Sequence, residues 1–421
     1  MKIRTRGYAF VLPWTFAVAG CGGGGGAAEV GSDAGDAGND AEAGVPKRVL
    51  VTANGASVSE LVAVNVATKK VDGRLTFPGS SATTDAHSTL FPFLLEQSNS
   101  VVARLDADRP WVIDSSWNVL LNDETDGGLS YSNPYAVVIG AGSKAYVLRY
   151  NRNRIAVIDT SQAVEAGAPT STIDLSSLVQ SGGDGSVEMT SGAYVAAKNM
   201  LYVVLGNINQ GDVTGPPNYD LLCTDTTSQV IGIDTTTDKV VHIGSGAGGS
   251  IALTGFDPVE NGLVYDTKND RLLVLEAGCN PAPSADAGPD ASPGPISKRG
   301  VEAVNLADGS TKILLDASQS GYPSGFVYID KNDAVLGFDF TGSEVYKWDP
   351  TSSKLGDLIP NAPDTFTYDG AGNLLGTVTK GTSASVVSVA IATGKSTSLF
   401  DGNPFTIKFD AIGGVDLWPH P

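Results

Sequence analysis

A short strand-and-turn unit recurs along most of this chain. Each copy is an apolar strand that ends in an Asx or small residue, followed by a turn rich in Thr, Ser and Gly, often with Lys, and then a second strand. Asx residues and glycine suit such hairpins because they tolerate positive φ and cap the turn. Seven segments carry the pattern: Leu61–Asn65, Trp111–Asp114 (the poorest copy), Ile155–Asp159, Val230–Asp234, Val301–Asn305, Val345–Asp349 and Val387–Ala390.

The spacing of these segments is close to the length of one propeller blade. Their last residues are separated by 49, 45, 75, 71, 44 and 41 residues. Four of these intervals fit one four-stranded blade of about 45 residues, and the other two are longer by roughly thirty. Each long interval holds a loop-like insertion, at about 207–228 and 278–298, and one cysteine of the pair Cys223 and Cys279. The insertions therefore hide a regular repeat.

The two ends of the chain supply one further repeat. The 31 residues after Ala390 and the 17 from Arg48 to Asn65 together make 48. This length is expected if a strand near Thr406–Phe409 or Val415–Trp418 joins the first blade. The repeat therefore predicts an all-β fold over residues 46–421: a seven-bladed β-propeller closed by its N- and C-terminal strands. An open sandwich, or two domains of Greek-key type, is the alternative.

A second apolar strand precedes several of the repeat segments, as in Ala145–Leu148, Leu201–Leu205 and Arg271–Leu275. The succession of Leu-Tyr-Val-Val and Val-Ile-Asp-Thr-Thr-Thr resembles the YVTN-type and related quinoprotein-like or lactonase-like propellers, over about residues 48–421. The resemblance implies a fold, not an activity. It also implies that loops joining the second and third strands of a blade lie on the face that holds ligands.

The N-terminus has the three parts of an export signal. Lys2, Arg4 and Arg6 are followed by an apolar run too short to span a bilayer permanently. Val18-Ala19-Gly20-Cys21 then resembles the bacterial lipobox. The resemblance implies cleavage of a lipoprotein signal peptide, residues 1–20, and lipidation of Cys21. An ordinary secretory signal with a coincidental cysteine is the alternative.

The residues that follow the lipobox predict where and how the protein is held. Residue 22 is Gly rather than Asp, which favours the outer membrane in some Gram-negative sorting systems. Residues 21–45 are almost wholly Gly, Ala, Asp, Glu, Ser and Asn, so they have no apolar face to bury. We expect a disordered tether here, and a lipid-anchored protein of the cell envelope.

The net charge excludes one class of binding partner, and the cysteine content predicts a disulfide. The net charge of −19 becomes −22 once the three positive charges of the signal are removed. Such an acidic domain is repelled by nucleic acid, so no nucleic-acid partner is expected. Cys223 and Cys279 remain as an even pair in an exported chain, which favours a disulfide over two free thiols.

The sequence offers few catalytic constellations. The chain has three histidines and no Gly-x-Ser-x-Gly elbow, so neither a histidine metal cage nor a Ser/His/Asp hydrolase is expected. His87, placed in the connection after blade one, is either a catalytic base or a surface loop residue. Carboxylates cluster in two connections, where they are either oxygen ligands of a possible Ca²⁺ site or ordinary turn formers: Asp123, Glu124, Asp126, Asp184 and Glu188.

These observations predict a surface-anchored lipoprotein whose propeller is a binding platform for a protein, a glycan or an envelope component. The alternative is a metal-dependent, lactonase-like hydrolase that uses acidic residues of the channel. Enzymatic activity is the less favoured reading, and no cofactor beyond the possible Ca²⁺ is implied. The membrane, through the lipid anchor, and an envelope or extracellular ligand are the expected partners.

Overall fold

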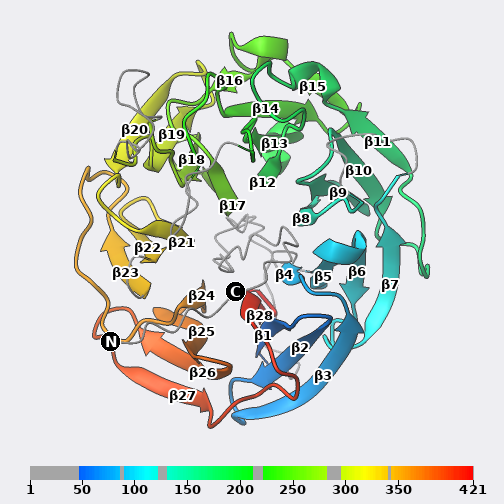
Figure 1. Cartoon of the computed structure of the whole chain (residues 1–421), viewed down its shortest axis with the longest axis vertical. Helices are drawn as coiled ribbons and strands as arrows, with labels where there is room; N and C mark the ends of the chain where they lie inside the picture. The colour runs from blue at the N-terminus through cyan, green and yellow to red at the C-terminus, as the bar shows by residue number, and fades with distance from the viewer. Residues whose placement is uncertain are drawn as a thin grey trace, which may run out of the picture.

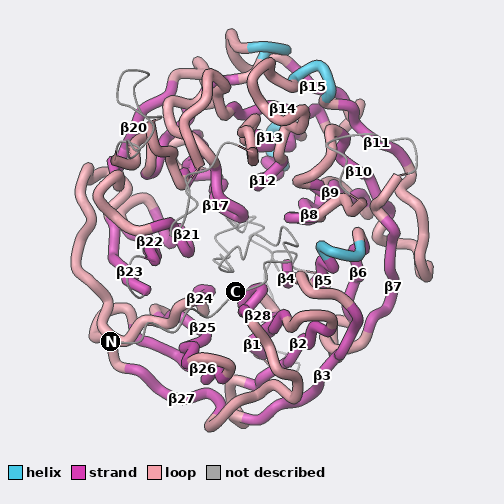
Figure 2. Tube along the Cα trace, in the orientation of Figure 1, coloured by secondary structure: helices cyan, strands magenta, loops and turns pink. Residues whose placement is uncertain are grey.

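The computed structural model describes residues 47–85, 90–121, 130–211, 221–281, 295–339 and 343–420. Across these residues the chain forms seven antiparallel sheets arranged as blades around one axis (Figure 1). Helix in the described chain is limited to single 3₁₀ turns (Figure 2): η1 Gln97–Asn99, η3 Ser176–Leu178, η4 Ala196–Lys198 and η5 Ala247–Gly249. The prediction of an all-β, seven-bladed propeller is confirmed.

The blades are numbered along the chain, and the strands of each are given from the axis outward. Blade one has β28 Ala411–Trp418, β1 Arg48–Asn54, β2 Val58–Asn65 and β3 Lys70–Pro78. Blade two has β4 Thr83–Asp85, β5 Phe93–Glu96, β6 Val101–Leu105 and β7 Ile113–Asn118. Blade three has β8 Pro134–Ile139, β9 Lys144–Arg149, β10 Arg154–Asp159 and β11 Ser171–Asp174.

The remaining four blades repeat this order. Blade four has β12 Met189–Val195, β13 Met200–Leu205, β14 Gln229–Asp234 and β15 Lys239–Val241, with β16 Ile251–Ala252 also paired to β14. Blade five has β17 Pro258–Asp266, β18 Arg271–Glu276, β19 Gly300–Asn305 and β20 Thr311–Asp316. Blade six has β21 Tyr322–Asp330, β22 Asp333–Asp339 and β23 Ser343–Trp348, and blade seven has β24 Thr365–Tyr368, β25 Asn373–Lys380, β26 Ser383–Ala390 and β27 Ser396–Phe400.

The ring is closed by the last strand of the chain. β28 pairs antiparallel with β1 as the innermost strand of blade one, with Arg48 opposite Trp418. The candidate strand at Val415–Trp418 is therefore confirmed, whereas Thr406–Phe409 lies in the connection that leads into β28.

The repeated Asx residue has a common structural role. It ends the third strand of a blade or directly follows it, and its side-chain oxygen accepts the backbone N–H two residues later, which fixes the turn that follows the strand. This bond joins Asn65 to Ala67, Asp159 to Ser161, Asp234 to Thr236, Asn305 to Ala307 and Asp349 to Thr351. The sequence repeat is thus a repeat of one capped hairpin.

The interpretation of Trp111–Asp114 as a third strand is wrong. In blade two the third strand is Val101–Leu105, and the capped turn begins at Asp106, which accepts the N–H groups of Asp108 and Arg109. The turn lacks the Thr/Ser/Gly–Lys sequence of the other copies, so it does not stand out. Ile113 and Asp114 belong to the outer strand β7.

Blade six differs from the others in having three strands. The segment that follows β23 makes an isolated bridge between Tyr346 and Leu358, with backbone bonds from Lys347 N to Asp357 O and from Ile359 N to Val345 O, but no regular strand. Gly356 and Pro360 flank this point, and proline cannot donate to a sheet ladder, so a regular fourth strand does not continue here.

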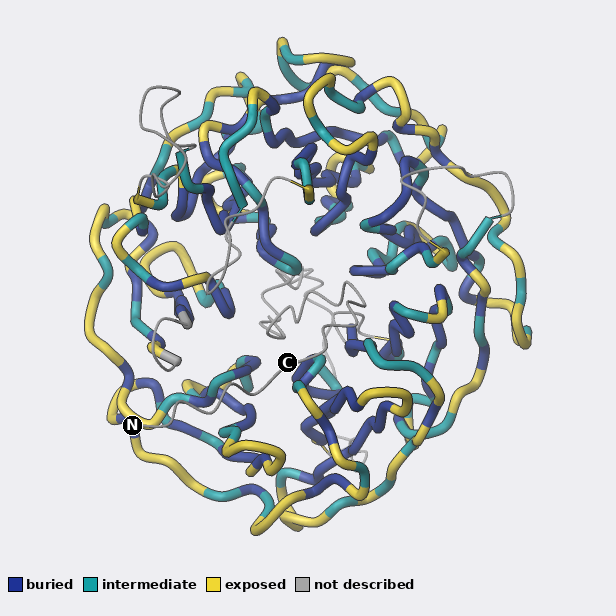
Figure 3. Tube along the Cα trace, in the orientation of Figure 1, coloured by how far each residue is buried: buried dark blue, intermediate teal, exposed yellow. Residues whose placement is uncertain are grey.

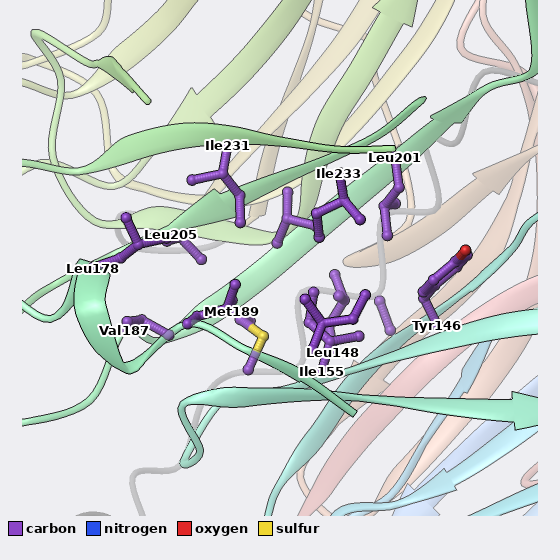
Figure 4. Close-up of a cluster of buried hydrophobic side chains, with 14 of the residues drawn as sticks. Tyr146, Leu148, Ile155, Leu178, Val187, Met189, Leu201, Leu205, Ile231 and Ile233 are labelled. Atoms are coloured by element: carbon purple, nitrogen blue, oxygen red, sulfur yellow. The ribbon is translucent and has the colours of Figure 1, made fainter. Parts of the chain in front are cut away.

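Each pair of neighbouring blades shares its own apolar core. Seven clusters of buried side chains lie at the seven blade interfaces, including the one between blades seven and one. Figure 4 shows the cluster between blades three and four, where Leu148 and Ile155 meet Leu201 and Ile233. Buried residues accordingly dominate the inner strands, and exposed residues gather at the rim (Figure 3). Because full burial of such a side chain stabilises by about 1.5–3 kcal/mol, the ring is held by all seven interfaces together.

The antiparallel order gives the ring two unlike faces. Since the innermost strand and the second strand run in opposite directions, the loops that enter a blade lie on the same face as the loop between its second and third strands. We call this the disulfide face, for the reason given below. The capped Asx turns lie on the opposite face.

Candidate functional site

A disulfide joins the loops of blades four and five. Cys223 precedes β14 and Cys279 follows β18, and their sulfur atoms are bonded with a Cα–Cα distance of 5.0 Å. Two backbone hydrogen bonds also join these loops. Cys223 N donates to Asn280 O at 2.9 Å, and Asn280 N donates to Leu221 O at 2.8 Å. The predicted disulfide is confirmed, and it ties two second-to-third-strand loops across a blade boundary.

A small apolar core beneath the disulfide connects it to blade three. Ile208, Phe256 and Cys279 are buried together, and the Tyr150 ring packs against them. Tyr150 is stacked on Tyr135 with ring centroids 4.5 Å apart and an interplanar angle of 25°. The disulfide, its loops and two tyrosines of the neighbouring blade thus form one packed unit.

The structure brings together two residues proposed from the sequence, Asp184 and Glu188. Glu188 is fully buried at the entrance to β12, and its Oε2 accepts the backbone N–H of Ile208 at 2.9 Å. Burial and the adjacent Asp184 carboxylate raise the pKa of Glu188 well above its usual range. Asp184 is exposed, and its backbone N–H donates to Ile208 O at 3.2 Å. These contacts fasten the loop that carries Ile208.

Two further carboxyls lie at the start of β17 and retain partial exposure to solvent: Asp257 and Glu260. Burial raises the pKa of Asp257 to about 7, against the opposing effect of Arg299. Burial, followed by the charges of Asp85 and Asp416, raises the pKa of Glu260 to about 8. Asp85 and Asp416 belong to the innermost strands of blades two and one, so Glu260 faces the centre of the ring.

Two tyrosines of blade three lie near these two carboxyls. The charge of Glu260 raises the pKa of Tyr135, and the charge of Asp257 raises the pKa values of both Tyr135 and Tyr150, with burial as the larger cause in each case. Tyr322 at the start of β21 is 38 % exposed, and Arg299 lies over its ring at 6.0 Å. We call Tyr135, Tyr150, Asp257, Glu260 and Tyr322 the axial cluster.

Arg299 anchors this cluster to the disulfide loop. Its guanidinium donates to the carbonyl oxygens of Ala277, Ser320 and Gly321 at 2.6–2.9 Å. It therefore holds the end of the loop from blade five against the entrance to blade six, beside Tyr322. The buried, hydrogen-bonded Arg299 therefore helps to fix the position of the partly exposed Tyr322.

The other residues proposed from the sequence are not tested. Cys21, His87, Asp123, Glu124 and Asp126 lie outside the described residues. The placement of His87 in the connection after blade one is wrong. That connection ends at Ala82, and position 87 follows β4 of blade two in the chain order. Within the described ranges no group of three or more His, Cys, Asp or Glu could hold a metal ion. The hydrolase alternative, which depends partly on residues outside these ranges, stays a prediction.

The axial cluster was missed by the sequence analysis for a physical reason. The repeat marks third strands and their turns, whereas these five residues stand at the beginnings of innermost strands or just after a second strand. Their one sequence signal is position on the disulfide face, which is known only once the blades are assigned.

No helix in the described chain is both long and apolar enough to cross a membrane. No protein-family model matches the sequence, and no curated protein matches it.

Solved structures match the fold at low sequence identity. A putative 6-phosphogluconolactonase from Bacteroides fragilis aligns with a TM-score of 0.55 and 12 % identity, over 90 % of this chain and 99 % of that one. The dihydro-heme d1 dehydrogenase NirN aligns with a TM-score of 0.49 and 10 % identity, over 88 % and 74 %. AztD from Citrobacter koseri aligns with a TM-score of 0.44 and 10 % identity, over 88 % and 98 %. The first of these likenesses supports the propeller fold, and none assigns an activity.

Proposed function

We propose that this protein is a lipid-anchored envelope protein whose propeller binds a protein, a glycan or another envelope component at the axial cluster. The observation that carries the proposal is the fastening of Tyr135, Tyr150, Asp257 and Tyr322 to the disulfide-bonded loops. Binding residues that stand on rigid supports lose little conformational freedom when a ligand binds. The disulfide would supply that rigidity outside the reducing cytoplasm.

Among these ligand classes, the chemistry of the cluster favours a glycan. Sugar rings pack on aromatic faces, and their hydroxyl groups bond to carboxyl groups at the edge of such a site. With pKa values of about 7 and about 8, Asp257 and Glu260 are partly protonated near neutral pH, so they both donate and accept hydrogen bonds. A partly neutral pair suits an uncharged polyhydroxyl ligand better than a fully ionised pair would.

The test is binding of the purified chain to an array of envelope glycans, including peptidoglycan fragments and outer-membrane oligosaccharides. We expect Tyr322→Ala to lower the affinity for a retained glycan at least tenfold. Tyr368→Ala is the matched control, because Tyr368 ends the innermost strand of blade seven on the opposite face. Equal loss in both variants, or retention that neither variant changes, would place the ligand elsewhere.

The anchor needs a separate measurement. In cells grown with a radiolabelled fatty acid, the mature protein should carry label and sediment with membranes, and Cys21→Ala should lose both properties. Density separation of the two membranes then tests the proposed outer-membrane location. Release of the unaltered protein into the soluble fraction would contradict the lipid anchor without affecting the glycan proposal.

A further inference from the structure

A groove on blade seven has no residue in common with the axial cluster. Its volume is about 600 Å³, which lies within the range of about 300–1,000 Å³ that small-molecule sites occupy. Strands β25 and β26 and the start of β27 line it. The loop before β24 adds Asn361 and Ala362, and the loop after β27 adds Gly402 and Asn403. We call it the blade-seven groove.

The loop before β24 is held in place by contacts with both neighbouring blades. Blade six has three strands, and the chain leaves it after Ile359, whose N–H donates to Val345 O at 2.8 Å. Asn361 Nδ2 then donates to Gly394 O in blade seven at 3.2 Å. Gly394 has a φ of 65°, and a Cβ there would lie 2.6 Å from Pro360 Cδ, so glycine allows this close approach. This part of the lining is therefore fixed by specific contacts.

The loop after β27 is fixed as well. Asn403 Oδ1 accepts the backbone N–H of Phe405 at 3.3 Å, and the buried Phe405 ring packs on Phe409 with centroids 5.1 Å apart. Pro404 O accepts Nε and Nη2 of Arg74 at 3.3 and 3.0 Å. These contacts leave the amide nitrogen of Asn403 as a donor. Because both loops are already ordered, a ligand in the groove would restrict little further motion of the protein.

The polar side chains of the groove can still form hydrogen bonds with a ligand. Ser383, Ser385, Ser396 and Lys380 all line it and are exposed. Within the ranges that the structure describes, the three hydroxyl groups make no hydrogen bond with protein and the Lys380 ammonium makes no ion pair. The lining also has an apolar part, which includes the buried side chain of Ala384. The groove thus combines several donors with a small apolar surface.

Charge decides which class of ligand the groove fits. Among its described lining residues Lys380 alone is charged, and none is aromatic. In a chain of net charge −19, this site attracts an anion where most of the surface would repel one. Asp364 lies beside the lining, but its Oδ2 accepts the N–H of Thr379 at 2.6 Å, so it is directed at the backbone of β25. Without an aromatic face, neither a nucleotide base nor a neutral sugar finds a stacking partner here.

We propose that the blade-seven groove binds an acidic sugar whose carboxylate pairs with Lys380. The serine hydroxyls and the Asn403 amide are partners for sugar hydroxyls, which both donate and accept hydrogen bonds. One lysine matches the single charge of a carboxylate better than the higher charge of a phosphate. Lys380 and Ser383 flank the loop between the second and third strands of blade seven, so this end of the groove opens on the disulfide face. The site is separate from the axial cluster, and failure of glycan binding there would leave this proposal standing.

The experiment measures binding of D-galacturonate to the purified full-length chain by ligand-observed NMR at low ionic strength. D-Galactose, acetate and galactose 1-phosphate are the comparison ligands, and we expect galacturonate to bind more tightly than each of them. Lys380→Gln should weaken galacturonate binding by about fivefold, as expected for one exposed ion pair. Lys354→Gln, which removes an exposed lysine of blade six outside the groove, should preserve it. Ser385→Trp should abolish binding, because the larger side chain would fill the groove.

Three results would overturn the proposal. They are equal binding of galactose and galacturonate, tighter binding of acetate or galactose 1-phosphate than of galacturonate, or equal effects of Lys380→Gln and Lys354→Gln. Far-UV circular dichroism checks that each variant folds. If Ser385→Trp does not fold, crystals of the unaltered protein soaked in galacturonate decide. Density for the sugar beside Lys380 supports the site, and density only elsewhere excludes it.

Discussion

Arg48 and Trp418 lie opposite each other in the antiparallel pairing of β1 with β28, although they stand near the two ends of the described chain. Trp418 also donates its indole N–H to Ala107 O at 2.7 Å, so the last strand is joined to blade two as well as to blade one. Closure between the chain ends removes the free edge that an open sheet would present. The stability of the ring therefore depends on a contact that forms between its two termini.

Leu417→Ala tests this closure. Leu417 is fully buried in β28 between blades seven and one, and we expect its truncation to cost about 2–5 kcal/mol of unfolding free energy. Denaturant unfolding followed by tryptophan fluorescence measures the change. Leu358→Ala is the matched control, because Leu358 is 50 % exposed and its loss should change stability by less than about 0.5 kcal/mol. Equal costs for the two variants would show that closure contributes little.

Replacing both cysteines by serine tests how much the disulfide stabilises the fold. Cys223 and Cys279 are separated by 56 positions, and the chain-entropy model gives about 4 kcal/mol for a loop of this length. We expect the double variant to unfold at lower denaturant concentration and to exchange amide hydrogens faster around Cys279. A reductant should destabilise the unaltered protein and leave the variant unchanged. Destabilisation of both by reductant would point to a different cause.

Asn65→Ala tests the capped turn that produces the sequence repeat. Asn65 Oδ1 accepts the backbone N–H groups of Ala67 and Thr68 at 3.0 and 2.9 Å. Loss of this acceptor leaves the two backbone N–H groups without their hydrogen-bond partner. We expect the free energy of unfolding to fall by about 1–3 kcal/mol, measured by thermal or chemical unfolding. Thr68→Ala changes an exposed side chain of the same turn and should be nearly neutral. Similar stability of the two variants would mean that water replaces the cap at no cost.

The blades could be predicted because their signal is local. An apolar strand, an Asx cap and a turn are adjacent in sequence, so each hairpin can be recognised without the rest of the molecule. The number of seven blades then followed from the spacing of the repeats. It is correct although Trp111–Asp114 was wrongly chosen, because the true turn at Asp106 lies in the same repeat. The disulfide followed from the even pair of cysteines.

The axial cluster could not be predicted because it is assembled from contacts between blades. The charges of Asp85 and Asp416 act on the pKa of Glu260 because closure of the ring brings their strands together. Tyr150 packs in the same apolar cluster as Phe256 because the loops of different blades fold against each other. No spacing in the sequence relates these residues. Of the pairs that were proposed, Asp184 and Glu188 do meet, but one carboxyl is buried beneath the loop rather than presented to solvent.

Glu260→Gln tests the electrostatics at the centre of the ring. The folded chain holds the Glu260 proton up to a pKa of about 8, whereas the unfolded chain releases it near pH 4.5. Unfolding therefore releases a proton between these values, so the stability that protonated Glu260 contributes is complete below about pH 4.5 and is lost as the pH rises toward 8. One group lowers the unfolding free energy by at most about 1.4 kcal/mol per pH unit in this window. We expect melting temperatures measured from pH 5 to pH 9 to fall less steeply for Glu260→Gln than for the unaltered chain. Asp308→Asn, which is exposed, should reproduce the unaltered slope, and parallel curves for all three proteins would contradict the placement of Glu260 beside Asp85 and Asp416.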